Sequence, residues 1–217
     1  MERATLATNG PFWRIGLPWF LASLPAAPLA VLPHEAGHYV VYWLLDVPDL
    51  RFYPMAVGWT NIPFRTAIAT GDLAAAAAIA PIRAVALAHL AGPVVTYLVV
   101  ALCCWACAWW KPLPVFVAIA YLSQVRVVAG VRHIADELLG RPIPDNRVFD
   151  ELQFSYLTGV PVEWPIGFGV AILAVSGTWL LRFFPSGQRA IAIPAMMAGL
   201  VTGAMLYAGV LAPWFSP

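Results

Sequence analysis

Long apolar runs separated by short polar stretches dominate the pattern of residues along this chain. A helix needs about 20 mostly apolar residues to cross a bilayer. Four runs approach or exceed that length, and each predicts one membrane span, at residues 84–110, 113–131, 164–181 and 190–215. An earlier run, 15–45, contains four prolines and is too long for one straight crossing. We expect it to form either one bent span or a span followed by a partial second one.

The stretch 46–82 departs from this pattern. It mixes turn-forming residues with aromatic ones, and its prolines at 48, 54 and 63 argue against a helix there. Short strands or a hairpin at the membrane surface are the structures it favours, followed by a short helix in the alanine-rich run 73–80. The prediction is therefore an all-α polytopic membrane protein with five to six transmembrane helices and a short membrane-surface hairpin after the first. We expect a single membrane-embedded domain over residues 1–217.

The composition agrees with this interpretation. Hydrophobic residues make up 61% of the chain against roughly 45–50% in soluble proteins, and charged residues 11% against about 25%. So much apolar surface requires lipid as its solvent, and we expect an integral, multi-pass protein in contact with the lipid bilayer. The compact chain without long loops favours a bacterial cell membrane. The net charge of +1, without a clustered basic face, excludes nucleic acid as a partner.

One motif in the first apolar run contains side chains that can bind a metal ion and transfer protons, the sequence HEAGH at residues 34–38. His34 and His38 are four residues apart, so on a helix both imidazoles lie on one face and can bind a single tetrahedral zinc ion. Glu35 can then take a proton from a zinc-bound water, which attacks a peptide carbonyl that the zinc polarises. An acid at the centre of a membrane helix costs on the order of 2.5–3.5 kcal/mol. A metal that compensates this cost favours a zinc site over a chance occurrence of the motif.

The motif and its surroundings resemble a known family. HEAGH in an apolar helix, followed by Ala91-Gly92-Pro93 in the next span, is similar to the site-2 protease family of intramembrane zinc metalloproteases. The resemblance implies a zinc-dependent endopeptidase that hydrolyses peptide bonds in or near membrane-spanning segments of protein or peptide substrates. It also implies a third zinc ligand, an aspartate from a later membrane helix. The chain has Thr96 at the position of the family's usual Asn, lacks its Leu-Asp-Gly motif, and has no room for a PDZ insert in 46–82, as in a compact bacterial-type relative.

Three aspartates are candidates for the third ligand. Asp150 opens the string DELQFSYLTGVP, which resembles shorter bacterial relatives in which an aspartate starts a helix, and it is our first choice. Asp145 lies in RPIPDNR, which is similar to the proline-rich approach to the family's aspartate. Asp136 follows His133 by three residues, so these two could form a ligand pair on their own helix. The predicted zinc site therefore consists of the two motif histidines and Asp150, with Asp145 and Asp136 as alternatives.

His89, in the span after the motif, has two interpretations. It could orient a carboxylate beside the zinc, or it could simply form a hydrogen bond to a neighbouring helix. We favour the hydrogen bond between helices.

A second functional class also fits the sequence. A non-catalytic membrane scaffold or transporter subunit could use zinc as a structural tie between helices. A closed structural zinc site needs a fourth protein ligand, whereas a catalytic site leaves one position open. Replacing Glu35 by Gln separates the two hypotheses, since only the enzyme should lose its function while it keeps its metal.

Overall fold

The computed structural model describes residues 12–47, 50–59, 62–110, 113–141, 149–184, 186–211 and 213. Within these ranges most residues are helical, and five helical segments are long and apolar enough to cross a membrane: Phe12–Leu44, Ile82–Trp109, Pro114–Leu138, Glu163–Phe183 and Ser186–Leu211. The predicted all-α polytopic architecture is therefore confirmed, and the chain is a multi-pass membrane protein by the length and composition of its helices.

The first apolar run forms two helices, α1 (Phe12–Ser23) and α2 (Ala26–Leu44). The break falls just before Pro25, because proline disfavours the helical conformation of the residue that precedes it. Pro33 lies inside α2 without ending it. The 19 residues of α2 rise by about 1.5 Å each, so the length of the helix is close to the thickness of a hydrocarbon core, roughly 30 Å.

The predicted hairpin follows α2. Strands β1 (Leu50–Tyr53) and β2 (Ala56–Trp59) pair antiparallel, and β1 packs against α2. The short helix predicted in the alanine-rich run is α4 (Leu73–Ile79). A further helix, α3 (Ile62–Ala69), contradicts our prediction that the prolines of this stretch, Pro63 among them, exclude a helix. Pro63 is the second residue of α3, where its missing N–H would have had no partner within the helix in any case.

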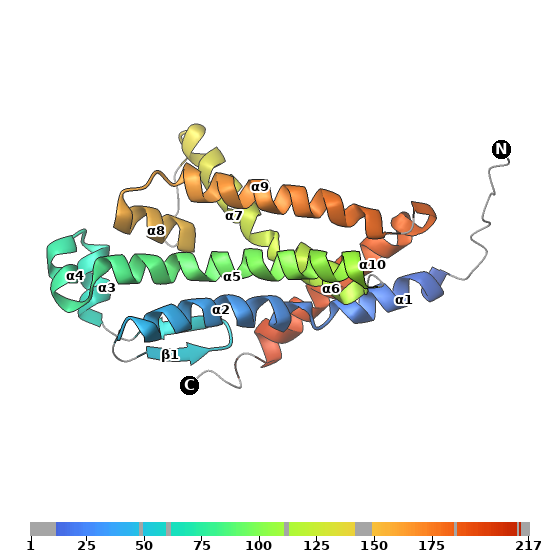
Figure 1. Cartoon of the computed structure of the whole chain (residues 1–217), viewed down its shortest axis with the longest axis horizontal. Coiled ribbons are helices and arrows are strands. Elements are labelled where there is room, and N and C mark those ends of the chain that lie inside the picture. Colours follow the sequence, from blue (N-terminus) through green and yellow to red (C-terminus); the bar gives the residue numbers. More distant parts are fainter. Residues whose placement is uncertain are drawn as a thin grey trace.

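Helix α5 (Ile82–Trp109) lies at the centre of the molecule. In Figure 1 it crosses the middle of the view, with α2 along one side and α9 (Glu163–Leu180) along the other, and it packs against both. The short helix α8 (Asp150–Thr158) also packs against α5. Elements that are far apart in the sequence therefore meet along one helix.

The remaining spans complete the bundle. The third predicted span, 113–131, extends seven residues further and is divided at Gln124 into α6 (Pro114–Ser123) and α7 (Val125–Leu138). Helix α9 continues into a short 3-10 turn, η1 (Leu181–Phe183), and a second such turn, η2 (Ser186–Gln188), precedes α10 (Arg189–Leu206). A π-helical turn, η3 (Tyr207–Leu211), follows α10.

Two clusters of buried apolar residues hold these elements together. The larger joins α1, α2, α5, α6, α9 and α10, and in it the rings of Trp19 and Phe184 stack with their centroids 4.5 Å apart. The smaller joins α2 and α5 to α3 and α4 through residues such as Tyr42, Phe64 and Val85. The smaller cluster fixes the C-terminal end of α2 against the N-terminal end of α5, beside the histidines of the motif.

Candidate metal centre

The two motif histidines point from α2 toward α5. His34, His38 and Tyr42 follow one another at intervals of four residues, so they lie on one face of α2. All three are buried, with 7% of His34 and 6% of His38 exposed. The face that carries the chemistry is therefore also the face that packs on the central helix.

Glycines allow these two helices to approach closely. A Cβ atom added at Gly37 of α2 would lie 2.9 Å from the carbonyl oxygen of Ala91 on α5. On the facing side, a Cβ atom added at Gly92 would overlap Nε2 of His38 and lie 2.5 Å from Cε1 of His34. Gly92, part of the Ala-Gly-Pro sequence, is therefore the position at which the backbone of α5 accommodates both imidazole rings.

Asp150 completes a compact group with the two histidines. Its Oδ2 lies 3.3 Å from Nε2 of His34, and its Oδ1 lies 3.4 Å from Nε2 of His38. The two Nε2 atoms are 3.1 Å apart. Within the described residues, this is the group of three metal-binding side chains whose ligand atoms all lie within 4.8 Å of one another.

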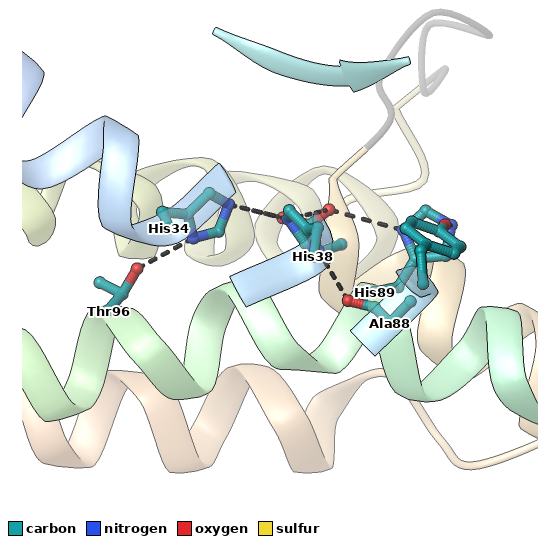
Figure 2. A network of polar contacts seen from close by, with 7 residues as sticks. His34, His38, Ala88, His89 and Thr96 are labelled. Atoms are coloured by element: carbon teal, nitrogen blue, oxygen red, sulfur yellow. Dashed lines mark hydrogen bonds and ion pairs between the residues drawn. The ribbon is translucent and has the colours of Figure 1, made fainter. Parts of the chain in front are cut away.

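Hydrogen bonds from α5 set the orientation of each imidazole. Nδ1 of His38 lies 2.7 Å from the carbonyl oxygen of Ala88, which can only accept, so Nδ1 carries the hydrogen and Nε2 of the neutral ring presents a lone pair. Nδ1 of His34 lies 2.9 Å from Oγ1 of Thr96. Figure 2 shows the two rings side by side, with His34 beside Thr96 and His38 beside Ala88.

This geometry fits a zinc ion. Two ligands that each lie about 2.0–2.1 Å from a tetrahedral ion are roughly 3.3 Å apart. The two Nε2 atoms are 3.1 Å apart, and each lies 3.3 or 3.4 Å from one of the two oxygens of Asp150, which is close to that spacing. Histidine nitrogens whose other ring nitrogen is hydrogen-bonded, together with one carboxylate, are the donors that zinc takes in catalytic sites.

Glu35 is the neighbour of His34 on α2 and is partly buried. It lies within electrostatic range of His38 and of Tyr207, which belongs to the π-helical turn η3. The Tyr207 hydroxyl donates a hydrogen bond to the carbonyl oxygen of Pro54, at the turn of the hairpin. The hairpin and the last span therefore meet close to Glu35, a connection that no local sequence pattern indicated.

Of the two alternative ligands, the structure describes Asp136. Asp136, on α7, lies 3.7 Å from Nε of Arg132 and 3.8 Å from Nη1 of Arg141, so its carboxylate faces guanidinium groups. His133, the possible ligand partner of Asp136, is buried against the ring of Phe149. Asp145 lies outside the described residues. The structure thus brings Asp150, our first choice, to the histidines, and holds Asp136 in a separate ionic cluster.

The position of Asp150 differs in one respect from what the family resemblance implies. It is the first residue of α8, which has nine residues and is too short to cross a membrane. Gly159, with a φ of 74°, ends α8 in the left-handed conformation that favours glycine. A short helix packed on α5, rather than a later span, carries the carboxylate.

Comparisons of the chain with protein-family models, with curated proteins and with solved structures find no match. The chemistry of these side chains and their arrangement are therefore what a functional proposal has to rest on.

Proposed function

We propose that this chain is an intramembrane zinc metalloprotease, similar to compact bacterial-type members of the site-2 protease family. It would hydrolyse peptide bonds in or near membrane-spanning segments of other proteins in a bacterial cell membrane. The observation that carries the proposal is the compact group of His34, His38 and Asp150, in which the two Nε2 atoms are 3.1 Å apart and each lies 3.3–3.4 Å from one oxygen of the carboxylate. Glu35, adjacent on the same helix, supplies the acid–base group that peptide hydrolysis requires.

The residues around the site have separable tasks. A zinc ion bound there would polarise the carbonyl of the substrate and lower the pKa of a bound water to about 7. Glu35 takes the proton of the attacking water and passes it to the leaving amine. The carbonyl oxygen of Ala88 and the hydroxyl of Thr96 hold the imidazoles in orientations that direct Nε2 toward the shared centre.

The ligand count favours an enzyme over a scaffold with a structural zinc. Structural zinc sites are closed by four protein ligands, whereas catalytic sites use three and leave one position open. The described part of the chain provides three ligand atoms within reach of one another. A partly buried glutamate next to the ligands is costly inside a membrane segment, and a role in acid–base catalysis accounts for it.

The hairpin offers a means of holding substrate. A peptide bond within a helix is shielded by its own backbone, so a substrate must unwind before it can be cut. The two-stranded sheet has outer edges whose backbone groups can pair with an extended peptide. The ring of Tyr39, next to His38, contacts the ring of Phe52 on β1 with 5.7 Å between centroids, which ties the sheet to the helix that carries the histidines.

Reconstituted protein tests this proposal. Wild type and Glu35→Gln would each be incubated in liposomes with solubilised bacterial membrane proteins, and new peptide termini identified by mass spectrometry. We expect termini within apolar segments that appear with wild type, vanish with a zinc chelator, and fall about 10²–10⁴-fold with Glu35→Gln while its zinc content is unchanged. Equal cleavage by the two proteins, or loss of zinc from Glu35→Gln, would contradict the assigned role of Glu35.

A further inference from the structure

We propose that His89, held by Tyr42, is a positioning residue that orients the Asp150 carboxylate for metal binding. This inference rests on the proposed zinc site and adds a requirement that the ligand motif does not contain. Nδ1 of His89 lies 3.6 Å from Oδ1 of Asp150, and Nε2 of His89 lies 3.5 Å from the hydroxyl of Tyr42. Figure 2 shows His89 beyond His38 along α5, next to Ala88.

The three residues form a chain with one consistent direction. The carboxylate oxygen of Asp150 can only accept, so the hydrogen of a neutral His89 ring lies on Nδ1, and Nε2 is then the acceptor for the Tyr42 hydroxyl. Oδ1 of Asp150 thus has His89 on one side and Nε2 of His38 on the other, while Oδ2 faces Nε2 of His34. Contact from His89 fixes the rotation of the carboxylate, because a turn about its Cβ–Cγ bond would separate Oδ1 from Nδ1.

Asp150 needs such a partner more than the histidines do. The histidines are carried by a 19-residue helix packed along α5, whereas Asp150 is the first residue of a nine-residue helix. As the first residue of α8, Asp150 also lies where the dipole of its own helix attracts a carboxylate. His89 draws the carboxylate toward α5 and away from this competing position.

Position on the helices supports the same role. Tyr42 follows His38 by four residues and lies on the ligand face of α2, with 6% of its surface exposed. His89 adjoins Ala88, whose carbonyl orients His38, and precedes Thr96, which contacts His34, by seven residues. One side of α5 therefore contacts all three proposed ligands, and His89 is its contact to the carboxylate.

A purely structural role for His89, as a tie between α2 and α5, makes different predictions. If His89 only joined the two helices, every substitution that breaks its contact with Tyr42 would have the same effect, whether or not the new side chain still contacts Asp150. A positioning role depends on a hydrogen donor at the place of Nδ1. His89→Leu removes that donor, whereas His89→Asn keeps one, because its amide NH2 takes the place of Nδ1–H and makes no contact equivalent to Nε2.

The experiment measures zinc affinity of the full chain in detergent by competition with a chromophoric chelator, and records the visible spectrum after cobalt replaces zinc. We expect His89→Leu to weaken zinc binding about 10–100-fold and to change the cobalt absorption bands. His89→Asn should recover most of the affinity and the wild-type bands. Tyr42→Phe should lower the affinity less, and Tyr39→Phe, the matched change on the same helix, should leave it unchanged.

The outcomes separate this inference from the proposed function. A wild type that takes up no zinc overturns the proposed metal site itself. A wild type with one zinc, and a His89→Leu variant of equal affinity and spectrum, overturns the positioning role alone. Failure of His89→Asn to bind better than His89→Leu does the same. Should His89→Leu not fold, equal zinc affinity of Tyr42→Phe and Tyr39→Phe would overturn it.

Discussion

Two regions of this molecule bring histidine and aspartate together, and they differ in what the carboxylate faces. At the contact of α2, α5 and α8, Asp150 faces Nε2 of both His34 and His38. On α7, Asp136 comes three residues after the buried His133, but its carboxylate faces Arg132 and Arg141. The guanidinium groups compensate the charge of the second carboxylate without a metal.

The difference shows that ligand-like spacing alone does not define a metal centre. Both pairs, HEAGH and HIAD, satisfy the spacing that places two side chains on one helical face. Within the part of the chain that the structure describes, the first pair forms a metal-binding group with a carboxylate from another helix, and a glycine, Gly92, accommodates its rings. The partners that distinguish the two regions come from distant parts of the chain.

The largest expected effect comes from removing a histidine of each region. Zinc sites with four ligands bind with about 10–16 kcal/mol, so His38→Ala should weaken zinc binding by on the order of 10²–10³-fold and abolish the proposed proteolysis. His133→Ala should leave zinc affinity unchanged, because His133 packs against Phe149. Chelator competition on the two purified proteins measures both. Equal losses would place His133 at the metal and contradict the distinction.

A crowded glycine in each region gives an intermediate effect. Gly92→Ala would push its Cβ into the His38 ring, and we expect zinc affinity to fall by roughly tenfold or more as the imidazoles move. In Gly130→Ala on α7, the added Cβ would lie 3.0 Å from the Ile166 side chain, so only packing should change. Zinc titration together with thermal unfolding separates the two. Unchanged zinc binding in Gly92→Ala would mean that the rings lie elsewhere.

The smallest effect concerns the hydroxyl that contacts His34. Thr96→Val keeps the shape of the side chain and removes the hydrogen-bond partner of Nδ1, so we expect zinc affinity to fall about tenfold, at the low end for such partners. Thr178→Val, an exposed position on α9 whose hydroxyl bonds to its own helix, is the matched control. Equal affinities of the two variants would show that Thr96 does not orient His34.

Local patterns were sufficient for the spans and for the histidine pair. Apolar runs of membrane-crossing length predict helices wherever they occur, and a spacing of four residues places two side chains together without knowledge of the fold. Helix α3 was not predicted. It begins with Ile-Pro, and the place of this proline in the first turn of a helix was not apparent from the sequence.

The rest depended on tertiary contacts. Asp150 is more than 110 residues from His38, and its place is set by the packing of α8 on α5, so the sequence left Asp145 and Asp136 open as well. His89 does bond to α2, as predicted, but its approach to Asp150 follows from the same packing. The meeting of Tyr207 with the hairpin turn at Pro54 likewise joins segments that are 153 residues apart.

The most direct test of the account is the zinc content per chain of detergent-purified wild type, Asp150→Ala and Asp136→Ala, measured by elemental analysis after zinc is supplied and excess removed. We predict about one zinc in wild type and in Asp136→Ala, and none in Asp150→Ala, because Asp150 is the carboxylate that lies with the two histidines among the described residues. A wild type without zinc, or a loss of zinc with Asp136 rather than Asp150, would contradict the account.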